Sequence, residues 1–227
     1  MTRYDFHLTG TALAIDDARF SWVARFGGDL DLIDYVRGRT TVTVDYEAVL
    51  GDEFRAFDPN QGNYTLEAAS SFRLHGTEIV GNFHHVSRHL GDRPKQFAIA
   101  WNTLGARVLR RWARNGTTVD LNVEGALVTQ KSYVDYTWIG QGGVTVRRML
   151  TPKAGVFVRG NGQLFGVDPV LVRRDRQAGG FVEGGVRLQG SAGAIELFAG
   201  YEHRVDAAPL DRTPQQWGMA GFRLVSR

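Results

Sequence analysis

Apolar and polar residues alternate with a period of two along most of this chain, which is the pattern of β-strands with two different faces. In residues 41–50 one face is formed by Val42, Val44, Tyr46, Ala48 and Leu50, whereas Thr43, Asp45 and Glu47 share the opposite one. Helical spacing is hard to find. The pattern predicts about twelve strands, at roughly residues 3–15, 20–35, 39–50, 62–74, 77–88, 97–112, 117–129, 132–148, 153–163, 179–190, 193–204 and 216–226.

The connections between these predicted strands alternate in length. Those that leave even-numbered strands are short, whereas those that leave odd-numbered strands include the long ones, at 51–61, 89–96, 166–177 and 206–215. Short turns on one rim and long loops on the other are typical of bacterial outer-membrane barrels. All six prolines fall between the predicted strands, as expected because proline cannot donate to a strand ladder.

The polar face of the predicted strands carries many charges of both signs. A soluble β-sandwich would turn these side chains to water, whereas a membrane barrel would turn them into its lumen, where they would pair and plug the interior. Aromatic residues near strand ends would then form the two interfacial girdles; they are Phe20, Trp22, Tyr35, Trp112, Tyr133, Tyr136 and Trp217. We therefore predict an all-β fold, a single transmembrane antiparallel β-barrel of about 12 strands that comprises residues 1–227 as one domain.

Composition narrows the function classes. The chain has 227 residues, 28 glycines, no cysteine and a formal net charge of +3, so disulfides, zinc fingers and cysteine nucleophiles are excluded, and nucleic-acid binding has no support. No stretch is long and apolar enough for a membrane helix, and the N-terminus lacks the apolar core of a signal peptide. The protein either stays inside the cell or is a mature chain with an added start Met; a bacterial outer-membrane location requires the second.

Three of the six histidines lie in residues 81–92. Because Ile79 and Phe83 belong to the apolar face, the alternation places His85 and Ser87 on the lipid-facing side. On the next predicted strand Asn102 is the polar member of a lipid-facing row. A hairpin that is symmetric about residues 94 and 95 would place Ser87 near Asn102, and His85 near residue 104. A hydroxyl, an imidazole and an amide on one patch provide a nucleophile, a general base and a group that orients the base.

This segment resembles the active-site hairpin of outer-membrane phospholipase A, a twelve-stranded barrel family. The matching residues are His85 and Ser87, then Trp101 and Asn102 on the following strand, with Leu104 and Arg107 continuing the motif. An outer-membrane lipid A deacylase family also uses His-x-Ser. The resemblance implies that His85, Ser87 and Asn102 are catalytic, that the protein acts as a homodimer on membrane lipids or lipopolysaccharide, and that calcium binds near Asp92.

The chain departs from that pattern in places. Arg88 and His89 follow the serine where both families usually have Asn, the loop before Asn102 is longer, and the other calcium ligands have no match. The string from His85 to Asp92 also resembles a bacterial envelope family of unknown function. Two interpretations stay open: a lipid ester hydrolase, or a non-catalytic structural or partner-binding barrel whose three residues are ordinary rim polars. A diffusion porin is disfavoured by the mixed charge of the lumen.

Overall fold

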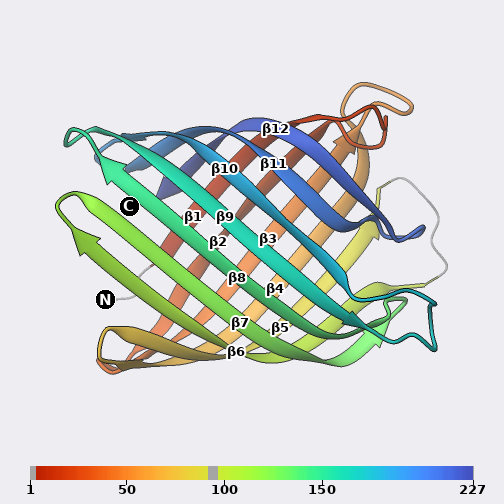
Figure 1. The fold of residues 1–227 in the computed structure, drawn as a ribbon, viewed down its shortest axis with the longest axis horizontal. Helices are drawn as coiled ribbons and strands as arrows, with labels where there is room; N and C mark the ends of the chain where they lie inside the picture. The colour runs from red at the N-terminus through yellow and green to blue at the C-terminus, as the bar shows by residue number, and fades with distance from the viewer. Residues whose placement is uncertain (1–3, 92–96, 227) are drawn as a thin grey trace.

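A computed structural model describes residues 4–91 and 97–226 of the chain. Twelve antiparallel strands form a closed barrel in which each strand pairs with its sequence neighbours and β1 closes against β12 (Figure 1). The strands are β1 (Tyr4–Ala14), β2 (Trp22–Asp34), β3 (Arg39–Gly51), β4 (Asp58–Leu74), β5 (Thr77–Leu90), β6 (Ile99–Arg114), β7 (Thr117–Ser132), β8 (Tyr136–Met149), β9 (Ala154–Val167), β10 (Gln177–Gln189), β11 (Gly193–Ala208) and β12 (Thr213–Ser226). The predicted fold class and strand number are confirmed.

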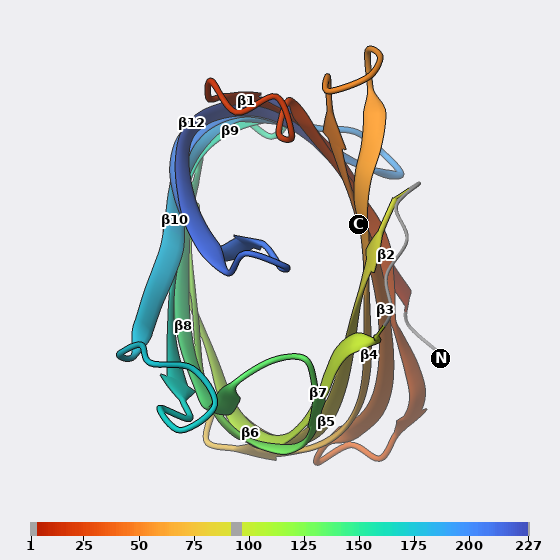
Figure 2. The ribbon, with the colours of Figure 1, turned by 90° about the vertical axis from the view of Figure 1, so that its right-hand side faces the viewer.

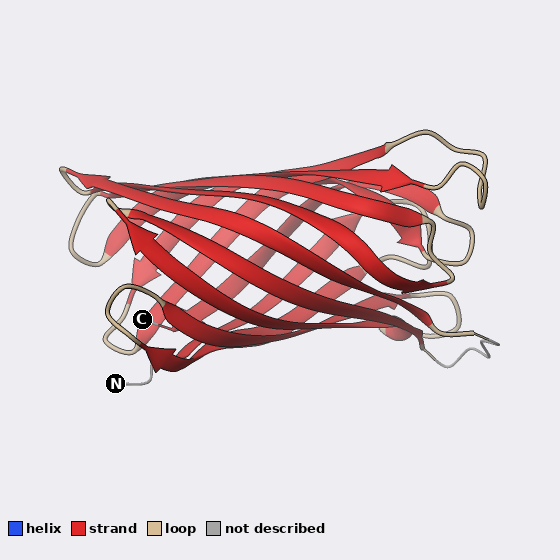
Figure 3. Ribbon diagram, turned by 90° about the horizontal axis from the view of Figure 1, so that it is seen from below, coloured by secondary structure: helices blue, strands red, loops and turns tan. Residues whose placement is uncertain are grey.

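The described residues contain no helix that is long and apolar enough to cross a membrane, and Figure 3 shows only strands joined by loops.

The two rims differ as predicted. Both chain ends lie at the rim of short turns, on the left of Figure 1. Two of these turns have only two residues, 75–76 and 115–116, and all four residues have positive φ angles between 47° and 77°. Two-residue hairpin turns of this kind match the twist of the flanking strands, and Gly76 and Gly116 supply the left-handed conformation without a steric cost. The opposite rim carries the longer connections.

Most strands extend further toward the long-loop rim than the sequence predicts, and three of the four long loops are correspondingly shorter. Pro59 and Pro214 lie inside β4 and β12, so the prediction that every proline falls between strands is wrong for these two. Each is the second residue of its strand, and the register shifts close by, between Val49 and Leu50 on β3 and between Arg204 and Ala208 on β11. At a strand end beside an irregular ladder, the missing proline N–H is tolerated.

Alternate residues of each strand point out of the barrel and form an apolar exterior. Exposed large hydrophobic side chains of the central strands include Val44, Leu66, Phe83, Leu104, Leu127, Val144, Val158, Val182, Leu197 and Phe222. Such a band is what a lipid bilayer requires of a spanning barrel. The alternation in the sequence therefore identifies the outward-facing residues of these strands correctly.

The other face of the strands fills the lumen with ion pairs. Arg107 of β6 pairs with both Glu67 of β4 and Glu124 of β7. Arg204 of β11 reaches Glu47 of β3 at 3.1 Å, which links two strands far apart around the barrel. A cavity of about 570 Å³ remains among these side chains. The predicted mixed charge of the interior is confirmed for the described residues.

The long-loop mouth is narrowed by the end of the β11–β12 hairpin, which leans inward across the opening in Figure 2. Arg88 donates to the carbonyl oxygens of Asp206 and Ala207, at 2.6 and 3.1 Å. A small apolar cluster packs around this hairpin: Phe20, Val23, Val49, Ala207, Ala208 and Trp217. Three predicted girdle residues, Phe20, Tyr136 and Trp217, are thus buried inside the barrel, whereas Trp22, Tyr35 and Trp112 are exposed on its surface as predicted.

Arg174, in the β9–β10 connection, adds a second closure of the mouth. Its guanidinium contacts Asp135 and Asp206, both buried, at 2.5 and 2.6 Å. Burial alone would lower the pKa of Arg174, but hydrogen bonds to Asp206 and Asp135 outweigh it and raise the pKa above its ordinary value. Arg174 therefore stays charged. It ties the β9–β10 connection to the β7–β8 connection through Asp135 and to the end of β11 through Asp206.

Candidate active site on the outer face

The hairpin of β5 and β6 positions the three predicted catalytic side chains on the exterior of the barrel. His85 lies opposite Asn102 in the strand pairing, and Ser87 lies opposite Ala100. The hairpin is thus staggered by two residues relative to the symmetric arrangement predicted from the sequence. A shift of two keeps every side chain on its expected face, so His85 and Asn102 still meet, and they meet directly across the pair.

His85 and Asn102 form the first contact of the site. His85 Nδ1 lies 2.7 Å from Asn102 Oδ1, and Asn102 Nδ2 donates to Gln130 Oε1 at 2.9 Å. Because the amide oxygen can only accept, it is His85 Nδ1 that carries the proton in the neutral ring. The lone pair is left on Nε2, which is the tautomer that a general base needs in a triad.

A β-bulge on β7 makes possible the second contact of the site, the hydrogen bond between Asn102 and Gln130. The register between β6 and β7 shifts at Asn102 and Thr103, which pair with Gln130 and Val128. Thr129 is the extra residue, and its hydroxyl donates to Asn102 O at 3.4 Å. Bulges re-aim side chains, and this one brings Gln130 to the outer face beside Asn102. The amide of Asn102 is thereby held in the orientation that serves His85.

Ser87 contacts a different imidazole. Its Oγ lies 2.9 Å from Nε2 of His89, the next residue on the same face, and no hydrogen bond joins Ser87 to His85 in the described structure. The ring of His89 meets the ring of Tyr64 edge-on, with centroids 5.3 Å apart. Rotation about one side-chain bond of Ser87, between ordinary rotamers, would turn the hydroxyl from His89 toward His85.

The depth of Ser87 along the barrel is marked by aromatic rings. Ser87 pairs with Tyr64 of β4, which packs on Tyr46 of β3 at 4.8 Å, which in turn packs on Phe26 of β2 at 5.2 Å. Rows of exposed aromatic side chains lie at the level of lipid headgroups in membrane barrels. In a bilayer we therefore expect Ser87 to lie near the level of the lipid headgroups.

The described residues supply no ligand set for the calcium ion that the resemblance implies. Calcium takes six to eight oxygen ligands and prefers carboxylates. The side chains that pair with His85 and Ser87 across the sheet offer a phenol and an amide but no carboxylate. Among residues 4–91 and 97–226 no group of three or more histidines and acids could hold a metal ion. Asp92, the predicted ligand, lies outside the described residues.

Two members of this site were not predicted from the sequence. His89 has the same strand parity as His85 and Ser87, so alternation alone could have identified it. Gln130 could not have been found in this way, because without the bulge Thr129 would lie opposite Asn102. Asn82 and His84 have the opposite strand parity and face the lumen: the Asn82 amide bonds Glu124 at 3.0 Å and His84 contacts Glu67.

Solved structures share this fold. The chain is similar to outer-membrane phospholipase A from Escherichia coli, with a TM-score of 0.58 and 12% sequence identity over 99% of this chain and 90% of that one. It is similar to a Salmonella typhi outer membrane phospholipase described as a dimer with bound calcium, with a TM-score of 0.57, 12% identity and the same coverage. No protein-family model and no curated protein matches the sequence. The fold is that of bacterial outer-membrane β-barrels.

Proposed function

We propose that this outer-membrane barrel is a lipid ester hydrolase of the phospholipase A type, with Ser87 as nucleophile, His85 as general base and Asn102 as the group that orients the base. The observation that carries the proposal is the 2.7 Å contact between His85 Nδ1 and Asn102 Oδ1, on the same outward face as Ser87. Polar side chains are costly on a lipid-facing surface. A linked set of them at headgroup depth calls for a role that ordinary packing does not supply.

The chemistry follows from the tautomer of His85. Ser87 Oγ turns to His85 Nε2, attacks the ester carbonyl carbon and gives its proton to that nitrogen. The tetrahedral intermediate collapses, the bond to the alkoxy oxygen breaks, and the leaving lysolipid alcohol takes the proton from His85. A water molecule then attacks the acyl-Ser87 ester, again with His85 as base, and releases a fatty acid and free Ser87. Asn102 keeps the imidazole in position during both halves.

Two features in the descriptions of the similar solved structures agree with this assignment. One structure of the Escherichia coli enzyme is described as an active-site mutant in which an asparagine is replaced by alanine. An asparagine in that role agrees with the place of Asn102 beside His85. The Salmonella enzyme is described as a calcium-bound dimer, so dimerisation and a calcium requirement near Asp92 belong to the proposal as expectations. The substrate class is a membrane lipid ester, from phospholipid or from lipopolysaccharide.

The test compares wild type with Ser87→Ala and with Ser132→Ala, in detergent with and without calcium. Ser132 is a matched control because its hydroxyl lies on the neighbouring part of the sheet and only bonds Ala98 O, at 2.8 Å. We expect Ser87→Ala to lose about a thousandfold or more of the rate of lipid hydrolysis. We also expect a fluorophosphonate probe to label wild type and Ser132→Ala but not Ser87→Ala. EDTA should slow hydrolysis while the barrel stays folded.

The hydrogen bond between Ser87 and His89 favours the competing interpretation, a non-catalytic barrel whose rim polars satisfy one another. In that case wild type neither hydrolyses lipid nor reacts with the probe, with or without calcium. Equal hydrolysis by wild type and Ser87→Ala would likewise contradict the proposed nucleophile. Conductance of nanosiemens in planar bilayers would instead support a porin, which the ion pairs across the lumen argue against.

A further inference from the structure

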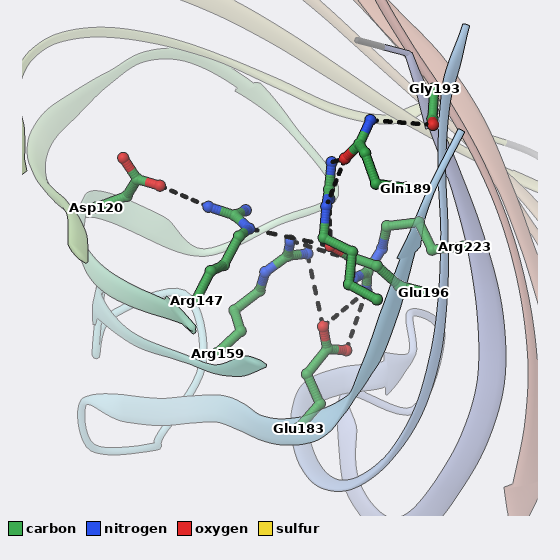
Figure 4. Close-up of polar contacts among 9 residues, drawn as sticks. Asp120, Arg147, Arg159, Glu183, Gln189, Gly193, Glu196 and Arg223 are labelled. Atoms are coloured by element: carbon green, nitrogen blue, oxygen red, sulfur yellow. Dashed lines mark hydrogen bonds and ion pairs between the residues drawn. The ribbon is translucent and has the colours of Figure 1, made fainter. Parts of the chain in front are cut away.

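The lumen contains a cluster of arginines that its acidic neighbours do not balance. Glu196 is fully buried, and four guanidinium groups surround it, those of Arg147, Arg159, Arg187 and Arg223, at distances from 2.7 to 3.9 Å (Figure 4). Glu183 is the second carboxylate of the group, and it contacts two of the same arginines. Four cations therefore meet two anions on the wall formed by β8 to β12.

The cluster continues toward the short-turn rim without losing its excess of positive charge. Asp120 pairs with Arg147 and also with Arg111, each at 2.5 Å, and Asp5 adds a further negative charge near Arg111. The acidic side chains at that end therefore offset the charge of Arg111 as well as that of Arg147. The uncompensated charge remains around Glu183 and Glu196, inside the barrel, where charges are screened less than at a surface.

Two of these arginines are incompletely used. Arg159 makes no hydrogen bond within the described residues, and its ion pairs to Glu183 and Glu196 are long, at 3.5 and 3.8 Å. Arg147 Nε is buried and has no hydrogen-bond partner. An arginine fork is well suited to bind two oxygens of one oxyanion. The donor capacity for such a ligand is therefore present on Arg159.

A second feature of this wall, which we call the Gly143 recess, lies two residues along the strands from Arg159 and its partner Thr145. Gly143 of β8 faces the lumen and pairs with Asn122 on β7 and Asn161 on β9. A Cβ atom at Gly143 would lie 2.9 Å from Asn122 Nδ2 and 3.2 Å from Asn161 Nδ2, so only a glycine lets the two amide groups lie this close to the strand. Neither amide makes a side-chain hydrogen bond to another described residue. Amide N–H groups are oxyanion donors, as guanidinium N–H groups are.

The cavity of about 570 Å³ gives access to this place, since Arg159, Asn161, Glu183 and Arg223 all line it. We propose that the lumen holds a binding site for a small phosphate-type oxyanion, formed by Arg159 together with the amides of Asn122 and Asn161 around the Gly143 recess. The site lies on the inner wall, separate from the outward-facing Ser87, and does not depend on the proposed hydrolase activity.

The experiment is calorimetric titration of the purified barrel in detergent with inorganic phosphate at low ionic strength. We expect saturable binding, much weaker binding of chloride, and a loss of affinity of about tenfold or more in Arg159→Gln, because a charge-assisted hydrogen bond is removed. The control Arg25→Gln lines the same cavity, but Arg25 is bonded to Asp45 at 2.7 Å, so its phosphate affinity should change little.

A second pair of variants tests the recess without changing charge. Gly143→Ala fills the space between the two amides and should weaken phosphate binding severalfold, whereas a Cβ at the neighbouring Gly142 would come no closer than 3.7 Å to Asn122 O, so Gly142→Ala should bind as wild type does. Circular dichroism and thermal unfolding verify that each variant is folded. Absence of saturable binding by wild type, or equal affinity in wild type, Arg159→Gln and Gly143→Ala, overturns the proposal.

Discussion

The lumen and the outer face of β5 both carry linked polar side chains, yet the two sets answer different demands. In the lumen, each of the four arginines around Glu196 contacts a carboxylate, although these arginines outnumber the acids. On the outer face, His85, Asn102 and Gln130 form one short chain at the edge of an apolar surface. The lumen needs its polar residues for stability, whereas removing the outer ones should leave the barrel intact and change only its chemistry.

The largest expected effect on stability comes from the lumen. Glu196→Leu leaves four arginines without their central carboxylate, and breaking a buried ion pair from one side costs about 3 to 5 kcal/mol. The outer-face control Gln130→Leu removes an exposed amide and should cost less than about 0.5 kcal/mol. Urea unfolding in detergent measures both. If the two variants unfold alike, the distinction between the two polar sets is wrong.

The outer face should show the reverse behaviour in activity. Asn102→Ala leaves Ser87 and His85 in place but removes the acceptor for His85 Nδ1, so we expect the hydrolysis rate to fall by about tenfold to a hundredfold, less than for loss of the nucleophile. Gln130→Ala acts one link further away and should have a smaller effect. Rates are compared at equal amounts of folded protein. A fall in Gln130→Ala as large as that in Asn102→Ala would contradict this order.

The role of each imidazole beside Ser87 can be separated. His89→Phe retains a ring against Tyr64 but removes the acceptor that holds the hydroxyl, and one hydrogen bond is worth about 0.5 to 1.5 kcal/mol. We expect a rise in activity of about twofold to tenfold, as the hydroxyl is released to His85. His85→Phe should abolish hydrolysis. If His89→Phe is the inactive variant instead, then His89 is the base.

The smallest expected effect lies in the β1–β2 loop at the mouth. Arg19 hydrogen-bonds Asp17 and keeps the pKa of that carboxyl below its ordinary value. A lowered folded-state pKa means that the stabilisation is complete above the ordinary carboxyl pKa and disappears as the pH falls through the lowered one. Wild type should therefore melt slightly above Asp17→Asn at pH 7 and at the same temperature in strong acid. A difference that grows in acid would contradict this sign.

The sequence determined which face each residue occupies, because alternation is a property of the strand itself and does not depend on partners. That is why twelve strands, the ionic lumen and the outward placement of His85, Ser87 and Asn102 follow from the pattern alone. The two-residue turns are local as well, since Asn115 and Gly116 suit a tight hairpin without help from the rest of the chain.

Only the closed barrel decided how neighbouring strands are staggered and where they bend. The stagger of β5 against β6, which brings His85 rather than Ser87 opposite Asn102, depends on the shear that twelve strands must share to close. The bulge at Thr129 is a feature of the β6–β7 pairing, and the inward lean that buries Trp217 and Ala207 arises from contacts between segments far apart in the chain. A period of two is unchanged by a shift of two residues, so alternation fixes the face of a side chain but leaves its partner across the sheet to the tertiary structure.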